Sequence, residues 1–179
     1  MKPDRKVIIY IAMSLDGYIA DSNESLDFLS LVEQEGQDYG YTEFIKSVDT
    51  IIIGRKTYDK VISMGYEYPH TDKDVYIITR TERPAIGTYK YYTGNLQDLV
   101  YSIKSKPGKD IYCDGGAEIV TELLKNHLVD ELIISVIPIL LGNGIRLFKD
   151  GQTLQKLNLV NSKQFDRGLV QLHYKCVTN

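Results

Sequence analysis

The sequence predicts an α/β protein with a largely parallel sheet, and three observations lead to this fold class. Apolar runs rich in valine and isoleucine alternate with helical patterns as far as Asn126. Several of these runs pass directly into glycine-containing turns. The tail differs, because two β-rich runs, Leu157–Phe165 and Leu169–Val177, flank the turn signal Asp166-Arg167-Gly168. We therefore expect antiparallel strands at the C-terminal edge of the sheet.

The predicted strands share a high content of apolar, β-branched residues. Val7–Met13 is typical of a central strand buried on both faces. After a turn at Ser14–Gly17, the run Tyr18–Ala20 is expected to continue that strand. The other strands are expected at Thr50–Ile53, Val75–Thr79, Tyr89–Tyr92, Ile111–Cys113 and Glu131–Leu141.

Helical patterns fill the segments between these strands. Leu96–Ser105 carries its apolar residues on one face, and Pro107-Gly108 ends it. Ser25 is a candidate cap for a short helix. The expected helices are Leu26–Glu33, Tyr41–Ser47, Thr57–Ser63, Leu96–Ser105 and the segment that follows Gly116.

Composition is that of an ordinary globular protein. The 179 residues, 43% of them apolar and 25% charged, fit one domain that spans residues 1–179. A net charge of −3 gives no basic surface for nucleic acid. The first apolar run is too short to cross a bilayer, and no cleavage site follows it. We expect a cytoplasmic protein with no membrane partner.

Cysteine and histidine residues have no metal-ligand spacing. Cys113 and Cys176 lie far apart, and His70, His127 and His173 are scattered. We therefore expect no metal site and, in the cytoplasm, reduced thiols.

The chemistry is concentrated where strands end. Ile111–Cys113 runs into Asp114-Gly115-Gly116 and then into a helix. Glycines permit close approach to the backbone, and the helix N-terminus offers unpaired N–H groups to a phosphate or pyrophosphate. Taken alone, a Gly-Gly turn is more often plain chain geometry than a ligand site. Two further strand ends, at Gly54–Thr57 and Thr79-Arg80, carry residues that can bind ligands.

The basic residues at these strand ends favour a phosphorylated nucleotide. Arg55 and Arg80 could grip a phosphate monoester, and Lys56 and Thr57 could contact a pyrophosphate. The alternative is that these cations are ordinary solvated surface charges. Their shared position favours a dinucleotide with an extra phosphate. The G-x-G-x-x-G fingerprint and the G-x-S-x-G elbow are both missing, which disfavours an ordinary Rossmann dehydrogenase and a hydrolase.

Five segments in order together resemble the dihydrofolate reductase-like superfamily. The likeness is greatest to the C-terminal reductase domain of bacterial bifunctional riboflavin-biosynthesis deaminase/reductase proteins. The segments are SLDGYIA (14–20), IIGRKTYD (52–59), IITR (77–80), DGGAEIV (114–120) and VDELIISVIPILLGNG (129–144). The resemblance implies a three-layer α/β/α fold with a mostly parallel eight-stranded sheet. It also implies that NADPH binds in a cleft across the strand ends. The protein would be a stand-alone form of the reductase, without the deaminase domain.

The same resemblance implies a cofactor site. Arg55 and Arg80 would lie near the adenosine 2′-phosphate, and the Gly115-Gly116 bond, often cis in this superfamily, would meet the cofactor. Backbone groups early in the chain would line the nicotinamide pocket. The implied cofactor-binding residues are Ala12, Ile19, Ala20, Gly54, Arg55, Lys56, Thr57, Thr79, Arg80, Gly115, Gly116, Ala117 and Glu118.

Three carboxylates are candidates for the catalytic role. Asp16 or Asp114 could relay a proton if burial raised its pKa. The structural alternatives are a turn residue for Asp16 and a helix cap for Asp114. Asp27 is the third candidate, with a helix-dipole partner as its alternative.

The resemblance implies an NADPH-dependent reductase of a small heterocyclic substrate. The best candidate reaction is reduction of 5-amino-6-(5-phosphoribosylamino)uracil, with dihydrofolate as the alternative substrate. Tyr18 stands where riboflavin-type reductases often carry a lysine. A pterin site predicts that Asp27, Asp38 or Glu43 points into the cleft, whereas a ribosyl-phosphate site predicts a basic pocket.

Two non-enzymatic hypotheses stay open. A nucleotide-binding module would bind NADPH without turnover, and a structural dimerising domain would bind no nucleotide. The apolar C-terminal hairpin would expose an edge in a monomer, so we expect a homodimer.

Overall fold

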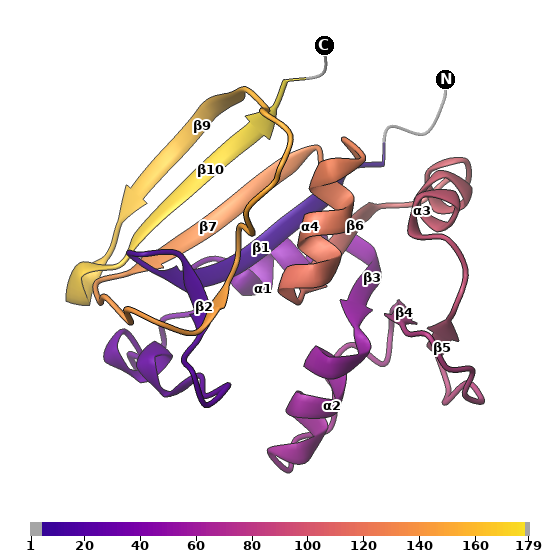
Figure 1. The fold of residues 1–179 in the computed structure, drawn as a ribbon, viewed down its shortest axis with the longest axis horizontal. Helices are drawn as coiled ribbons and strands as arrows, with labels where there is room; N and C mark the ends of the chain where they lie inside the picture. The colour runs from indigo at the N-terminus through magenta and orange to yellow at the C-terminus, as the bar shows by residue number, and fades with distance from the viewer. Residues whose placement is uncertain (1–4, 178–179) are drawn as a thin grey trace.

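A computed structural model describes residues 5–177, and its central feature is an eight-stranded sheet. In Figure 1, the two C-terminal strands lie at one edge of this sheet. In spatial order the strands are β5 (Tyr89–Tyr92), β4 (Asp74–Ile78), β3 (Val48–Gly54), β6 (Asp110–Gly115), β1 (Val7–Ser14), β7 (Glu131–Ile137), β10 (Val170–Cys176) and β9 (Leu157–Gln164).

Most neighbouring strands are parallel. β1 pairs in parallel with β6 and β7, and β3 does so with β4 and β6. β10 is antiparallel to both β7 and β9. The expectation of a mostly parallel eight-stranded sheet with an antiparallel C-terminal edge is therefore confirmed.

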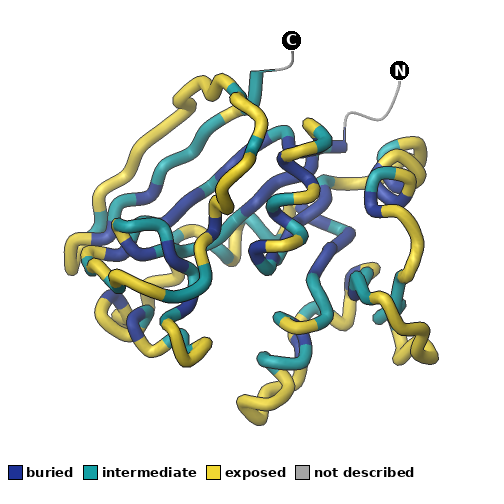
Figure 2. The backbone as a smooth tube through the Cα atoms, in the orientation of Figure 1, coloured by how far each residue is buried: buried dark blue, intermediate teal, exposed yellow. Residues whose placement is uncertain are grey.

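Helices cover both faces of the sheet and complete three layers. α3 (Leu96–Lys104) and α4 (Ala117–Lys125) pack on one face, over a core that includes Ile9 and Ile52. On the other face, α1 (Tyr41–Lys46) and α2 (Arg55–Ser63) contribute to a second cluster around Ile51 and Ile53. Figure 2 shows the buried central strands between these layers.

The turn after β1 differs from its prediction. Tyr18–Ala20 does not continue the first strand but forms β2, which pairs with β8 (Ile145–Arg146) in a separate two-stranded sheet. The chain turns sharply because Gly17 has a φ of +88°. The N–H of Tyr18 donates a hydrogen bond to the hydroxyl of Ser14 and not to a neighbouring strand.

Two further elements are shorter than predicted. The helix expected at Leu26–Glu33 is a single 3₁₀ segment, η1 (Asp27–Leu31), whose backbone N–H groups bond to the carbonyl three residues earlier, as the N–H of Leu29 does to the carbonyl of Leu26. The strand expected at Glu131–Leu141 ends at Ile137, because Pro138 has no N–H to continue the ladder.

Within residues 5–177, no helix is long and apolar enough to cross a membrane. The same residues hold no group of three or more His, Cys, Asp or Glu side chains able to bind a metal ion.

Candidate functional site

The sheet brings the three predicted strand-end turns to one edge. β3, β4 and β6 are parallel, and their carboxyl ends lie at the same level. Gly54 is paired with Ile78, and Ile53 is paired with Gly115. The turns that follow these strands are therefore neighbours, at the edge where open α/β sheets bind ligands.

Two glycine turns touch each other at this edge. A Cβ on Gly54 would lie 3.4 Å from the backbone nitrogen of Gly116. A Cβ on Gly116 would lie only 2.7 Å from Oγ1 of Thr57, closer than real side chains allow. The Gly115-Gly116 peptide bond is cis, as the family resemblance implied. Glycine at these positions thus permits the two backbones to pack together.

The helices that begin at these turns have open N-termini. α2 starts after Gly54 and α4 after Gly116, and no described side chain caps either helix. By contrast, the side chain of Asn95 caps α3 by accepting hydrogen bonds from two backbone N–H groups. The uncapped N–H groups of α2 and α4 can bind an anion such as a pyrophosphate.

Arginine and aspartate side chains surround the α2 turn. Nη1 of Arg55 lies 2.5 Å from Oδ2 of Asp59, and Nη1 of Arg83 lies 3.7 Å from Oδ1 of the same carboxylate. Lys56 and Arg80 are exposed and form no ion pair with another described residue. Sequence reasoning missed Asp59, although its spacing four residues after Arg55 on a helix signals such a pair.

A groove of about 550 Å³ lies beside the ends of β4 and β5. The guanidinium carbon of Arg83 lies 5.5 Å from the centre of the Tyr91 ring in this groove. Aromatic faces and a cation can hold a planar base and an anionic group. The described lining residues are Glu82, Arg83, Pro84, Tyr91, Tyr92, Thr93 and Gly94.

The remaining expected cofactor residues lie on several elements. Thr79 follows β4, and its hydroxyl accepts a hydrogen bond from the N–H of Thr81. Ala117 is buried at the start of α4, whereas Glu118 is exposed and 4.0 Å from Lys149. Ile19 and Ala20 belong to β2.

Asp16 holds the turn after β1 together. Its carboxylate accepts hydrogen bonds from the Ser14 hydroxyl (2.6 Å) and from the N–H groups of Leu141 (3.1 Å) and Gly142 (2.7 Å). The bond from Ser14 contributes most to lowering the pKa of Asp16. The raised pKa on which a proton-relay role depended is therefore not present at Asp16.

Asp114, at the end of β6, has a different environment. The hydroxyls of Tyr68 and Tyr112 donate hydrogen bonds to its two carboxylate oxygens, over 2.5 Å and 2.7 Å. Burial nevertheless raises the pKa of Asp114. Its carboxylate does not cap α4, which has no side-chain cap. Nothing in the sequence except its richness in tyrosine pointed to these two partners.

The other candidate carboxylates differ in position. Asp27 and Glu43 are exposed, and Glu43 pairs with Lys46. Asp38 lines a cavity, where its carboxylate accepts hydrogen bonds from the N–H groups of Gly40 and Thr42. These bonds, with one from the Thr42 side chain as the largest contribution, lower the pKa of Asp38 to about 2.

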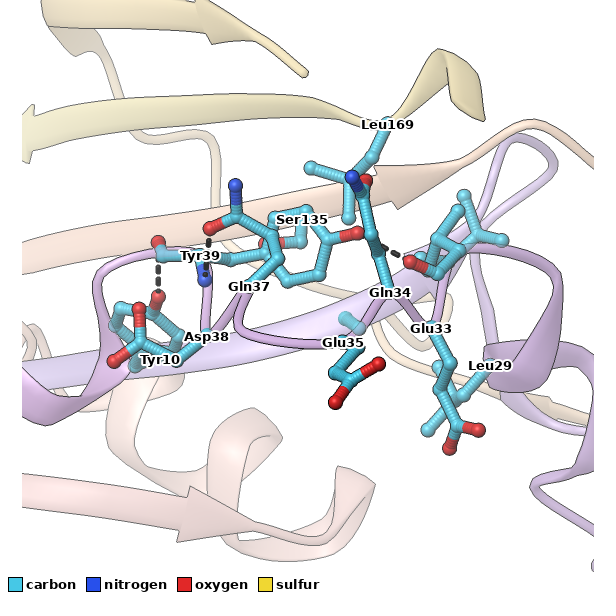
Figure 3. Close-up of a pocket in the computed structure, with 13 residues that line it drawn as sticks. Tyr10, Leu29, Glu33, Gln34, Glu35, Gln37, Asp38, Tyr39, Ser135 and Leu169 are labelled. Carbon is cyan, nitrogen blue, oxygen red and sulfur yellow. Dashed lines mark hydrogen bonds between the residues drawn. The ribbon is translucent and has the colours of Figure 1, made fainter. Parts of the chain in front are cut away.

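The cavity beside Asp38 has a volume of about 680 Å³ and lies between the segment 33–39 and the sheet. Figure 3 shows Tyr10 from the sheet hydrogen-bonded to Tyr39, with Ser135 beside them. The Tyr10 hydroxyl donates a hydrogen bond to the Tyr39 carbonyl oxygen, and the amide of Gln171 donates to the Ser135 hydroxyl. The described lining residues are Tyr10, Ala12, Leu29, Val32, Glu33, Gln34, Glu35, Gln37, Asp38, Tyr39, Ser135, Ile137 and Leu169.

The lining gives this cavity an acidic rim over an apolar floor. Glu33, Glu35 and Asp38 contribute carboxylates, and no lysine or arginine stands among the described lining residues. An anionic ligand would meet repulsion here, whereas a neutral or cationic ring with N–H groups would find acceptors.

Comparisons with known proteins agree with this architecture. Residues 5–171 match the family described as the RibD C-terminal domain. The uncharacterised protein YwjB of Bacillus subtilis is 40% identical over 172 residues, which cover 96% of this chain and 98% of YwjB. A second Bacillus subtilis protein, the uncharacterised YyaP, is 33% identical over 95% of this chain and 94% of its own.

Solved structures show the same fold. A putative riboflavin biosynthesis protein from Shewanella sp. PV-4 superposes with a TM-score of 0.88 and 31% identity, over 97% of this chain and 99% of that chain. Dihydrofolate reductase from Enterococcus faecalis superposes with a TM-score of 0.68 and 14% identity, covering 97% of each chain. The fold is therefore dihydrofolate reductase-like.

Proposed function

This chain belongs to the RibD C-terminal domain family, and we propose that it is an NADPH-dependent reductase of a small heterocyclic substrate. Two similarities support this proposal: a putative riboflavin biosynthesis protein is 31% identical to this chain, and the fold is shared with a dihydrofolate reductase solved in complex with NADP(H). When bound, NADPH supplies the hydride. The protein binds and orients the cofactor and the substrate, and it supplies the proton that accompanies the hydride.

The observation that carries this proposal is the pair of adjacent, uncapped helix N-termini. Gly54 and Gly116 bring the starts of α2 and α4 together, and Oγ1 of Thr57 lies between them. Two sets of free N–H groups fit the two phosphates of a dinucleotide. Arg55 and Arg80 stand beside this pair and would bind a 2′-phosphate.

Calorimetric titration with NADPH and, separately, with NADH tests the cofactor assignment. We expect tight binding of NADPH and binding of NADH about tenfold weaker or more, because only NADPH engages the arginines. If neither nucleotide binds, the proposal fails. Binding without turnover of any pterin or pyrimidine would instead support a nucleotide-binding module.

The substrate proposal follows from the cavity. The ribosyl-phosphate hypothesis requires a basic pocket, but the described lining is acidic. The lining thus favours a heterocycle without a phosphate over 5-amino-6-(5-phosphoribosylamino)uracil itself. Asp38 supports dihydrofolate as a second candidate, because an ionised carboxylate can accept hydrogen bonds from a pterin amino group and ring N–H.

Turnover measurements can separate these substrates. The loss of NADPH absorbance would be followed with dihydrofolate, with 5-amino-6-(5-phosphoribosylamino)uracil and with its dephosphorylated form. We expect the dephosphorylated compound to be reduced with a lower KM than the phosphorylated one. A preference for the phosphorylated compound would restore the riboflavin-pathway substrate and overturn the role given to the acidic rim.

A further inference from the structure

A single side-chain amide connects three of the segments that enclose the cavity beside Asp38. Gln171 lies on β10 and is 9% exposed. Its Nε2 atom lies 3.2 Å from Oγ of Ser135 on β7 and 3.1 Å from the hydroxyl oxygen of Tyr10 on β1. The same nitrogen lies 3.2 Å from the carbonyl oxygen of Tyr39. These three partners line the cavity, whereas Gln171 is not among the described lining residues.

The register of the sheet places these side chains together. Gln171 is paired directly with Ser135 in the antiparallel β7–β10 ladder, and Ser135 is paired with Ala12 in the parallel β1–β7 ladder. Directly paired residues point to the same face of a sheet, and so do residues two positions apart on one strand. Tyr10 stands two positions before Ala12. The amide and both hydroxyl groups therefore share the face on which the cavity lies.

The direction of each hydrogen bond in this group follows from the Tyr39 carbonyl, which can only accept. The NH₂ group of Gln171 must therefore face this carbonyl, and it also donates to the oxygens of Ser135 and Tyr10. The Tyr10 proton is used as well, because that hydroxyl donates to the same carbonyl over 2.9 Å. The Ser135 hydroxyl accepts from the amide, and its own proton has no acceptor among residues 5–177. Ser135 is thus the donor that this wall of the cavity leaves for a ligand.

Gln171 also holds the segment 33–39, which lies opposite the sheet across the cavity. Tyr39 has a φ of +58°, a left-handed backbone conformation that is unfavourable for a tyrosine. Its ring packs edge-on against Phe165, with the ring centroids 5.1 Å apart, and its hydroxyl donates to the carbonyl of Val32. Asp38 directly precedes Tyr39. The hydrogen bonds to the Tyr39 carbonyl therefore fix the backbone that carries the Asp38 carboxylate at the rim.

The wall and the rim of the cavity offer opposite hydrogen-bonding groups to a ligand. Ser135 offers a proton, and the carboxylates of Glu33, Glu35 and Asp38 offer acceptors. A ring that carries a carbonyl oxygen beside N–H groups can use both sides, as a pterin or an aminouracil does. A hydroxyl that accepts a hydrogen bond from an amide also becomes a stronger donor itself. The amide behind the wall therefore affects how firmly the wall binds a carbonyl.

We propose that Gln171 is a positioning residue for the substrate: its amide fixes the Ser135 hydroxyl as a donor to a carbonyl oxygen or ring nitrogen of the heterocycle, and it holds the Tyr39 segment in place. This inference rests on the proposed function, because it takes the cavity as the substrate site. Gln171 acts through Ser135 and Tyr39 and does not touch the ligand. Removal of its amide should therefore weaken binding of the heterocycle and leave the nucleotide site unaffected.

Substitutions by residues of similar size can test this role. Gln171→Met removes the amide, Ser135→Ala removes the hydroxyl, and Ser135→Thr keeps it. Gln97→Met is the matched control, because the amide of Gln97 donates to the Tyr101 hydroxyl on α3, on the opposite face of the sheet. Calorimetric titration would measure the binding of 6-methylpterin and of 5-amino-6-ribosylaminouracil. Titration with NADPH would verify that each variant keeps its nucleotide site.

We expect Gln171→Met and Ser135→Ala each to weaken the binding of both heterocycles about three- to tenfold, which is the effect of losing one hydrogen bond. The double variant should lose less than the product of the two single effects, because the amide acts partly through the hydroxyl. Ser135→Thr and Gln97→Met should bind within about twofold of the wild type. In turnover, Gln171→Met should raise KM and leave kcat nearly unchanged.

Hydrogen exchange tests the hold on the segment 33–39. The backbone amides of this segment should exchange faster in Gln171→Met than in the wild type or in Gln97→Met, because the Tyr39 carbonyl loses one of its two hydrogen bonds. If Gln171→Met does not fold, Gln171→Glu is the second variant. An ionised carboxylate would take the Ser135 proton for itself, so this variant should also weaken binding of the heterocycles.

Several results would overturn the inference. Unchanged binding of both heterocycles in a folded Gln171 variant would remove the positioning role, and so would strictly additive effects in the double variant. If the wild-type protein binds NADPH but neither heterocycle, the inference fails while the cofactor part of the proposed function stands. If it binds neither the nucleotide nor a heterocycle, both fail.

Discussion

Arg55 and Asp59 lie one turn apart on α2 and form an ion pair, with Nη1 and Oδ2 2.5 Å apart. Both side chains are more than a third exposed, so the pair itself adds little to stability. The pair joins the guanidinium of Arg55 to the next turn of α2. Asp59 also lies 3.7 Å from Nη1 of Arg83, so one carboxylate holds two cations near each other.

Arg55→Ala should weaken NADPH binding about tenfold and leave NADH binding nearly unchanged, because only NADPH carries the 2′-phosphate. Lys60→Ala is the control, since it removes a positive charge at the far end of the same helix. Calorimetric titration of both variants gives the comparison. Equal losses for NADPH and NADH would show that Arg55 does not bind the 2′-phosphate.

Gly116→Ala should destabilise the protein by about 1–3 kcal/mol, because the new Cβ would lie 2.7 Å from Oγ1 of Thr57. Removing that oxygen in the double variant Gly116→Ala/Thr57→Ala should recover most of the loss. Thermal unfolding of the wild type, both single variants and the double variant measures this coupling. Additive effects would mean that the two turns do not press on each other.

Asp16→Ala should lower the melting temperature at neutral pH without changing the turnover of the folded protein. The pKa of Asp16 is lowered on folding, so its contribution is present above the ordinary value of 3.8 and is lost as the pH falls below it. The difference in melting temperature should therefore shrink in acid. Asp27→Ala is the control, because Asp27 is exposed and its carboxylate forms no hydrogen bond with another described residue. Loss of turnover in well-folded Asp16→Ala protein would revive the proton-relay hypothesis.

The outer edge of the sheet leads to a proposal about assembly. β9 is exposed along its whole length, as Figure 2 shows, and carries the exposed apolar side chains Leu157, Leu159 and Val160. Such edges are usually covered, so we expect a homodimer with twice the chain mass of 20.4 kDa in light scattering. Leu159→Lys should shift the protein toward the monomer, whereas Tyr101→Lys, on the distant α3, should not. A wild-type monomer would contradict the proposal.

Much of the site could be predicted because its signals are local. A strand that runs into a glycine turn and a helix is written in consecutive residues, as at Gly54–Thr57 and Asp114–Gly116. Parallel pairing then brings such turns to one edge without further information. Asp16 was harder, because the N–H groups that it accepts from belong to a segment about 125 residues later in the chain.

The sequence by itself determined the order of strands and helices, the glycine turns and the basic residues beside them, since periodicity and turn chemistry act over a few residues. Only the tertiary structure decided which tyrosines reach Asp114 and that the cavity carries an acidic rim. These features depend on side chains that become neighbours only when distant segments pack on the same face of the sheet. No local pattern records such contacts, because burial and hydrogen bonding across the fold select them.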